Sequence, residues 1–274
     1  MVLDSHVHFW KYNKTDFAWI DKSMEVLRKD YLPGELESTL KRNLVDGCIA
    51  VQSGNQELDT RFLAELARTH PIIKGVIGWT DLSAPDLQKK LDGLKEYTSI
   101  KGLRHIAQTE PDDFYYGKNF RRGIGLLQEY RYTFDLLLFP RQLAAATALA
   151  TEYPSQTFIL DHCGKPDING SNKEEWEKGL RSLAACPNVY CKLSGLITEA
   201  SWKSWRPADF YPFLNTVFEC FGNERIMFGS DWPVMLLSGL YVQWKSLLEK
   251  YTEHFSPEDK DRIFGLNAAA VYGI

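Results

Sequence analysis

The chain has 274 residues, of which 44% are hydrophobic and 25% are charged, and these proportions exclude a disordered or fibrous protein. Its formal net charge of −4 at pH 7 provides no basic surface for nucleic acid or for an anionic membrane. No apolar stretch approaches the roughly 18 residues of a membrane-spanning helix, and the first residues lack a signal-peptide pattern. The five cysteines form no C-x-x-C pair and most lie in apolar runs, as reduced buried thiols do. We therefore expect a cytoplasmic protein, with its oligomeric state left open.

Short apolar runs rich in β-formers alternate with longer amphipathic segments along the whole chain. Several of these runs are almost continuously apolar, as strands of a parallel sheet covered on both faces are. The predicted strands span 2–9, 47–52, 72–79, 100–106, 133–139, 157–162, 188–194 and 225–229. The predicted helices span 34–45, 56–69, 84–97, 118–130, 141–152, 174–185, 207–221, 236–250 and 257–270.

Alternating strands and crossover helices imply a parallel sheet, and eight repeats of roughly 34 residues suit a closed barrel. The alternative is an open doubly wound sheet, which needs a glycine-rich phosphate turn after its first strand. That strand instead ends in His6-Val7-His8-Phe9-Trp10. No linker or charge block divides the chain, so we predict one α/β domain over 1–274, a (β/α)8 TIM barrel. Its long loop 10–33 would lie at the C-terminal ends of the strands, and a second long loop spans 164–172.

Four chemically active side chains end three of the predicted strands. His6 and His8 are two residues apart, so strand geometry turns both imidazoles to the same side. His162 ends the sixth run, and Asp231 follows the eighth run. Taken singly, the histidines could be satisfied by barrel neighbours and Asp231 could cap the next helix. Together at a barrel mouth they predict a divalent metal site, or three imidazoles beside a carboxylate that acts as a base on water.

Four segments then carry a more specific pattern, namely Leu3–Trp10, Ile159–Pro166, Val189–Leu196 and Ile226–Pro233. In sequence and order they resemble the amidohydrolase superfamily (amidohydrolase-2 type), and more narrowly its sugar-lactonase branch, which includes L-fuconolactonase and L-rhamnonolactonase. The resemblance spans nearly the whole chain. It implies a barrel that opens a sugar lactone, an aldono-1,4- or 1,5-lactone, with water.

The resemblance also implies roles for the four side chains at the strand ends. His6, His8 and His162 would surround the lactone carbonyl, directly or through a metal, and Asp231 would be the general base. If a single divalent ion is bound, the same four residues would be its ligands, and zinc is the expected ion. Within the lactonase branch some members use one weakly held metal and others use none, so both possibilities stay open.

The chain departs from the many superfamily members that bind two metals. Those members use a modified lysine at the end of the fourth strand and a histidine after the fifth. Here the fourth strand reads Ile100–His105, and the fifth run contains no histidine. A binuclear centre is therefore not expected. The functional alternatives are a metal-dependent decarboxylase or other hydrolase of the superfamily, and a non-catalytic barrel that binds a sugar acid.

Lys192 shares strand parity with Tyr190 and Ser194, which predicts that it points into the barrel. An unpaired buried ammonium is costly, so Lys192 should pair with Asp231, with a substrate oxygen, or with another barrel carboxylate. Arg104 and His105 are consecutive, so only one of them can face the site.

The other substrate-binding candidates are weaker. Gln52 ends the second predicted strand, and Trp10 follows the first strand, where an aromatic face could cover a sugar ring. Asp4 has the parity of His6, so it could orient a histidine or cap nearby backbone.

Overall fold

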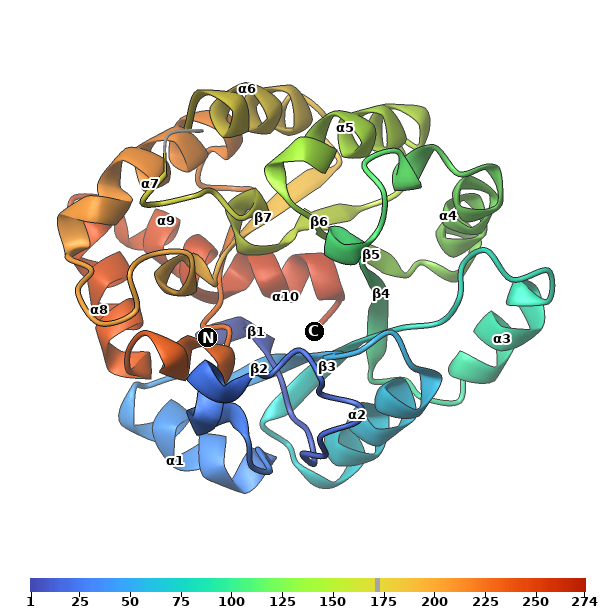
Figure 1. Ribbon diagram of the computed structural model, residues 1–274, viewed down its shortest axis with the longest axis horizontal. Coiled ribbons are helices and arrows are strands. Elements are labelled where there is room, and N and C mark those ends of the chain that lie inside the picture. The colour runs from blue at the N-terminus through green and yellow to red at the C-terminus, as the bar shows by residue number, and fades with distance from the viewer. Residues whose placement is uncertain (171–172) are drawn as a thin grey trace.

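Eight parallel strands form the wall of a barrel that is surrounded by helices (Figure 1). The computed structural model describes residues 1–170 and 173–274. Each strand pairs with the next one along the chain. The strands are β1 Leu3–Val7, β2 Gly47–Val51, β3 Ile73–Gly78, β4 Ile100–Ile106, β5 Thr133–Leu137, β6 Phe158–Leu160, β7 Val189–Leu193 and β8 Ile226–Phe228. The predicted (β/α)8 barrel is confirmed, and each predicted strand contains an observed one.

The helices agree with the predictions except near the C-terminus. They are α1 Pro33–Arg42, α2 Glu57–Thr69, α3 Leu87–Leu94, α4 Lys118–Tyr130, α5 Leu143–Glu152, α6 Lys173–Ala184, α7 Pro207–Phe221, α8 Tyr241–Tyr251, α9 Pro257–Asp261 and α10 Asn267–Tyr272. The segment predicted as 236–250 begins only at Tyr241, because Val234–Leu237 forms a separate helical turn. The Met235 carbonyl accepts from the amides of Ser238 and Gly239 and ends that turn. The last two residues of the loop 164–172 lie outside the described part of the chain.

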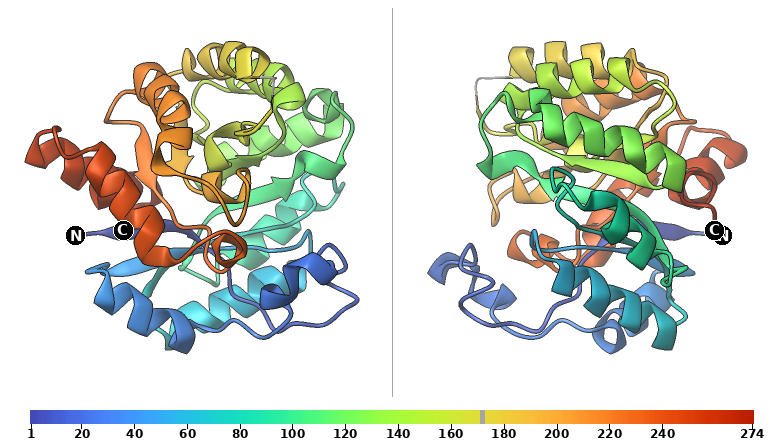
Figure 2. Two further views of the ribbon diagram at one scale, coloured as in Figure 1. Left: turned by 60° about the vertical axis from the view of Figure 1, so that its left-hand side comes forward. Right: turned by 90° about the vertical axis from the view of Figure 1, so that its right-hand side faces the viewer.

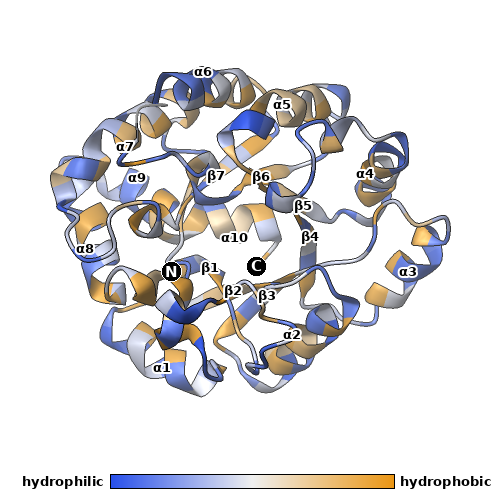
Figure 3. Cartoon of the chain, viewed as in Figure 1, coloured by the Kyte–Doolittle hydropathy of each residue, from blue (hydrophilic) through white to orange (hydrophobic). Residues whose placement is uncertain are grey.

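Apolar side chains pack in two layers, one between strands and helices and one inside the barrel. Hydrophobic and hydrophilic stretches alternate along the surrounding helices, as amphipathic helices require (Figure 3). The inner layer consists of Leu3, Ile49, Val51, Ile77, Ile159 and Met227 with Ala268, Ala269 and Tyr272 of α10. Helix α10 therefore closes one end of the barrel, and it crosses the centre of the ring in Figure 1. The functional candidates at the strand tips lie at the opposite end.

The termini, the cysteines and the lengths of the helices describe the remaining features of the barrel. The two termini lie on the same side of the molecule in both views of Figure 2. All five cysteines are free thiols, and four of them are buried. Among the described residues, no helix combines the length and the apolarity that crossing a bilayer requires.

The seam between β1 and β8 is joined by a few specific bonds instead of a regular ladder. The amide of Asp231 donates to the carbonyl of His6 at 2.8 Å, and the amide of His8 donates to the carbonyl of Trp232 at 2.7 Å. The carboxylate of Asp4 adds two more bonds, because its Oδ1 accepts from the amides of His6 at 3.1 Å and Ser230 at 2.8 Å. The seam thus fixes the backbone that carries His6 and His8 beside the backbone that carries Asp231.

Candidate active site

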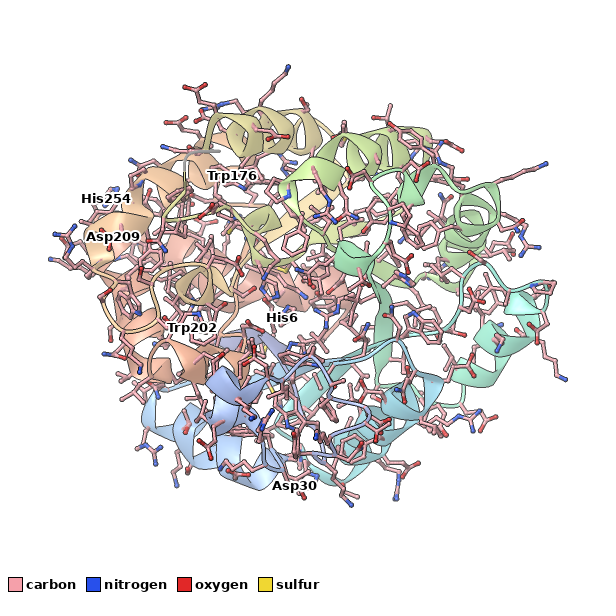
Figure 4. All side chains as sticks on the ribbon, in the orientation of Figure 1. His6, Asp30, Trp176, Trp202, Asp209 and His254 are labelled. Atoms are coloured by element: carbon pink, nitrogen blue, oxygen red, sulfur yellow. The ribbon has the colours of Figure 1, made fainter. Side chains whose placement is uncertain are left out.

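The four side chains predicted at the strand tips meet at one point. The Nε2 atoms of His6 and His8 are 3.2 Å apart, and His8 Nε2 is 3.3 Å from Asp231 Oδ1. The same oxygen lies 3.9 Å from His6 Nε2 and 4.0 Å from His162 Nε2. His6 lies near the middle of the ring of strands in Figure 4. All four residues are buried.

A bulge in β1 arranges its two histidines. Between Asp4 and Val7 the strand advances by three residues while β2 advances by two, so one residue is extra. Asp4 and His6 therefore lose their common parity, and Asp4 bonds to backbone amides and to the hydroxyl of Tyr241 at 2.9 Å. The expectation that Asp4 orients an imidazole is thus wrong, and its capping alternative is what the structure shows. Burial raises the pKa of Asp4 to about 6, although these bonds oppose the shift.

Each imidazole has a partner behind it that fixes its orientation. His8 Nδ1 is 2.8 Å from the carbonyl of Val51, and a carbonyl can only accept, so His8 carries its hydrogen on Nδ1. His6 Nδ1 faces the Asp161 carboxylate at 3.3 Å, and His162 Nδ1 faces the Ser194 hydroxyl at 2.8 Å. His8 Nε2 therefore presents its lone pair to the common point. His6 Nδ1 also lies 3.4 Å from Lys192 Nζ, and His6 Nε2 lies 3.3 Å from Arg104 Nη1, which can only donate, so Nε2 of His6 carries a lone pair as well.

His162 lies in a run of left-handed backbone. Residues 162–165 all have φ between 51° and 71°, although only Gly164 adopts such values without strain. The indole of Trp176 in α6 donates to the carbonyl of Cys163 at 2.8 Å, and Lys165 pairs with Glu199. Asp231 also has a positive φ of 62°. Strained backbone held from outside the turn is typical of functional sites.

Burial and charge set the protonation of the cluster. Burial lowers the pKa of His162 to about 4 and that of His6 well below its usual value. Burial would raise the pKa of Asp231, but His162, His8 and His6 outweigh it and hold that pKa below its usual range. At neutral pH the site therefore offers neutral imidazoles at positions 6 and 162 and an ionised carboxylate, the forms that bind a metal ion or accept a proton from water.

A buried charge network that the sequence analysis did not predict lies behind His6. Asp161 Oδ1 is 3.1 Å from Lys192 Nζ, and Asp161 Oδ2 is 2.9 Å from Arg104 Nη1. Lys192 Nζ is also 2.5 Å from Asp135 Oδ2. Burial favours the neutral form of Asp161, but Lys192, His6 and Arg104 hold its pKa well below the usual range. The two carboxylates are thus balanced by two cations, and Asp161 stays ionised beside His6, with Oδ1 3.3 Å from His6 Nδ1.

Lys192 points into the barrel as predicted, but its partners differ from the first expectation. Its side chain is fully buried and pairs with Asp135 and Asp161 instead of Asp231. The structure therefore shows the alternative in which Lys192 pairs with another barrel carboxylate. Both carboxylates were visible in the sequence as charged residues inside or next to apolar strands, at positions 135 and 161.

Strand alternation in β4 decides which of Arg104 and His105 faces the site. Arg104 faces inward, where Nη1 lies 3.3 Å from His6 Nε2. His105 faces outward, where its ring stacks on Phe114 and bonds to Glu110 and to the indole of Trp79. The prediction of His105 as a substrate contact is therefore wrong.

Gln52 and Trp10 are held by neighbouring residues. Gln52 is buried. Its side-chain amide donates to the backbone carbonyl of Arg104 at 3.2 Å, and its backbone carbonyl accepts from the Arg104 guanidinium. Gln52 therefore fixes Arg104. The indole of Trp10 donates to the carbonyl of Lys29 at 2.9 Å, and its ring centroid is 6.5 Å from that of His8.

The arrangement fits a single divalent cation. Two imidazole lone pairs that face each other at 3.2 Å repel unless a proton or a cation lies between them. Tetrahedral zinc with ligands at about 2.0–2.1 Å places neighbouring ligand atoms roughly 3.3 Å apart. The distances among His6, His8 and Asp231, from 3.2 to 3.9 Å, are close to that value, and these residues form a group that could hold a metal ion.

Comparisons with known proteins identify relatives over the full length of the chain. A family model for amidohydrolases matches residues 3–274. An L-fucono-1,5-lactonase of Burkholderia multivorans is 38% identical, and the match covers 99% of this chain and 96% of that protein. An L-fucono-1,5-lactonase of Burkholderia ambifaria is 34% identical, with 99% of this chain and 95% of that protein covered.

Among solved structures, a similar chain is an amidohydrolase from Burkholderia multivorans with bound zinc. It is 38% identical, the match covers 100% of this chain and 99% of that chain, and the TM-score is 0.95. The agreement extends over the whole barrel.

Proposed function

The chain belongs to the amidohydrolase family, and we propose that it is a lactonase that opens a sugar-acid lactone with water. The observation that carries this proposal is the convergence of three imidazoles on the ionised Asp231 at the tips of β1, β6 and β8. Two relatives matched over 99% of the chain are L-fucono-1,5-lactonases, which supports an aldono-1,5-lactone as substrate. The decarboxylase alternative has less support, because neither of these relatives is a decarboxylase.

Asp231 is the general base in this proposal. Its lowered pKa keeps it ionised at neutral pH, so it can accept a proton from the attacking water. The water oxygen then adds to the lactone carbonyl carbon. Protonated Asp231 returns the proton to the ring oxygen as the ester bond breaks, so the product is a hydroxy acid that loses its proton in solution.

His6, His8, His162 and Asp231 are the residues that would hold a divalent ion, with zinc the expected one. When bound, the ion would supply a Lewis acid that polarises the lactone carbonyl. Support for zinc comes from the spacing of the donor atoms and from the zinc in the similar Burkholderia multivorans structure.

The buried network behind His6 keeps the site in its working form. Asp161 lies 3.3 Å from His6 Nδ1 and favours a hydrogen on that atom and a lone pair on Nε2, as carboxylate partners of ligating histidines do. Lys192 and Arg104 hold Asp161 in place and neutralise it. Neither cation therefore contacts the substrate in this proposal.

A proton-release assay over aldono-1,4- and aldono-1,5-lactones tests the proposal, run with chelator and with added zinc. We expect turnover of at least one six-carbon 1,5-lactone, with faster turnover after zinc is restored. Failure to hydrolyse any lactone of the panel under either condition would refute the proposal.

A further inference from the structure

A cavity of about 190 Å³ lies between the segment that follows β1 and the segment that follows β2, and its lining begins at Trp10, two residues after His8. Trp10 and Tyr31 exchange backbone bonds of 2.9 Å and close the first segment into a loop. Trp10 and Phe17 of this loop form one wall, and Gln56, Asp59 and residues near them form the other. The cavity therefore lies next to the C-terminal ends of β1 and β2.

One wall of the cavity is aromatic and rigid. Trp10 is almost fully buried, and its ring packs 5.5 Å from Phe17 and 5.4 Å from Tyr31 between centroids. The indole bond to Lys29 fixes the orientation of that ring. A fixed aromatic wall suits the C–H face of a sugar.

The opposite wall carries polar groups that can form further hydrogen bonds. Asp59 Oδ2 accepts from the amide and hydroxyl of Ser53 at 2.7 and 3.2 Å and from the amide of Gly54 at 3.2 Å. Those three bonds hold the carboxylate rigidly and leave Oδ1 without a partner among the described residues. The side-chain amide of Gln56 likewise has no partner in the described part of the chain. A fixed acceptor next to a free amide is suited to hydroxyl groups.

The charge of the lining favours a neutral ligand. Asp16 and Asp59 outnumber Lys11, so the cavity carries a small negative excess that disfavours a carboxylate. The cavity is smaller than the pockets that bind drug-sized ligands. A volume of this size suits one part of a sugar molecule.

The cavity is close enough to the cluster to share one substrate with it. Trp10 lines the cavity and also lies 6.5 Å from His8 between ring centroids. Ser53 and Gly54 of the opposite wall follow Val51, whose carbonyl lies 2.8 Å from His8 Nδ1.

We propose that this cavity binds the hydroxylated part of the lactone, with Gln56 and Asp59 bonding its hydroxyls and the partly buried ring of Phe17, which packs on Trp10, covering its C–H face. The inference rests on the proposed lactonase function and names the residues that select a sugar lactone over a plain one. A substrate without hydroxyls forms no hydrogen bonds with Gln56 and Asp59, so these side chains do not increase its affinity.

The test compares L-fucono-1,5-lactone with δ-valerolactone, which has the six-membered lactone ring but no hydroxyls. Gln56→Ala removes the amide, and Asp59→Asn replaces the free acceptor by a donor of the same shape. Lys14→Ala, an exposed change in the same loop outside the cavity, is the control. We expect each cavity variant to raise KM for the sugar lactone about fivefold, as loss of one hydrogen bond does, with kcat and the δ-valerolactone KM unchanged.

Equal effects on both lactones, or no effect on either, would overturn the cavity proposal while leaving the lactonase proposal intact. If the wild type hydrolyses neither lactone, the lactonase proposal has failed instead. Calorimetric titration with L-fucose then tests the cavity alone. Binding that Gln56→Ala weakens and Lys14→Ala does not would support it, and any other result would overturn it.

Discussion

His6 Nε2 and His8 Nε2 face each other at 3.2 Å, and each ring has an oxygen atom behind it that faces Nδ1. These oxygens belong to the Asp161 carboxylate, 3.3 Å from His6 Nδ1, and to the Val51 carbonyl, 2.8 Å from His8 Nδ1, and both favour a hydrogen on Nδ1. Two lone pairs are thereby held close together before any ligand arrives. This preorganisation is the basis of the metal prediction.

Zinc should stabilise the folded chain through these two nitrogens. After treatment with chelator, zinc at 100 times its Kd should add about 2.7 kcal/mol to the free energy of unfolding. For a chain of this size that corresponds to a rise in Tm of roughly 5–10 °C. Thermal unfolding followed by circular dichroism measures the shift.

His8→Gln should abolish most of the zinc-induced rise in Tm, since it removes one of the two facing lone pairs. His254→Gln is the matched control, because His254 is exposed and far from the cluster in Figure 4. A zinc response of equal size in both variants would contradict the site.

Asp231→Asn should remove the proposed base with little change in packing. Loss of a general base costs about 10²- to 10⁴-fold in rate, so we expect kcat for lactone opening to fall by at least a hundredfold. Asp113→Asn, at an exposed carboxylate, should leave kcat unchanged. Near-normal kcat in a folded Asp231→Asn enzyme would remove the assignment.

The sequence was sufficient to predict the barrel and its four converging side chains. Strands buried on both faces produce apolar runs that are easy to recognise, and their C-terminal ends must meet in a parallel barrel. The convergence of Asp231 with His6 follows from that topology alone. The buried Asp135 and Asp161 also lie within or next to apolar runs, but their common partner Lys192 is on another strand, so their pairing depends on how the strands are arranged.

Other features depend on backbone geometry that no local pattern encodes. The bulge in β1 breaks the alternation between Asp4 and His6, so a parity argument fails there. The left-handed turn that contains His162 is held by Trp176 of α6, which bonds to the Cys163 carbonyl 13 positions earlier in the chain. Such long-range constraints become visible only once the helices are placed on the barrel.

Gly195 should be required for the position of His162. Its φ is +67°, and a Cβ there would lie 2.6 Å from His162 Nδ1. We expect Gly195→Ala to lose about 1–2 kcal/mol of stability from backbone strain and to lower kcat more than tenfold, because the imidazole must move. Gly273→Ala meets the same positive φ with no atom within 4 Å. Gly273→Ala should therefore lower stability without lowering kcat. Equal losses of kcat in the two variants would contradict the prediction.

Trp176 should hold the left-handed turn through its indole N–H. Trp176→Phe keeps an aromatic ring but leaves the buried Cys163 carbonyl without its donor, which costs about 1–3 kcal/mol. Because that carbonyl follows His162 directly, zinc affinity should fall as well. Trp205→Phe removes a similar bond, to the Ser238 carbonyl at 2.8 Å, outside the turn. Calorimetry should show weaker zinc binding in the first variant and normal binding in the second.

Lys192 should contribute to stability mainly by neutralising Asp135 and Asp161. Removing one partner of a buried ion pair leaves an uncompensated charge, so Lys192→Met should cost about 3–5 kcal/mol in urea unfolding at pH 8. Adding Asp135→Asn should restore part of that loss, because one of the two carboxylates is then neutral. A double variant as unstable as the sum of the single variants would mean that the pair is not coupled.

The loss in Lys192→Met should also depend on pH in a defined direction. Burial already raises the pKa of Asp135 above its usual value, and removing the ammonium raises it further. In the window between the unfolded and folded pKa values the folded state binds more protons, so stability falls as pH rises through it. The deficit relative to wild type should therefore be smaller at pH 5 than at pH 8. In the double variant Asp135→Asn/Lys192→Met the stability deficit relative to wild type should change less with pH, since the carboxyl that takes up the proton is gone.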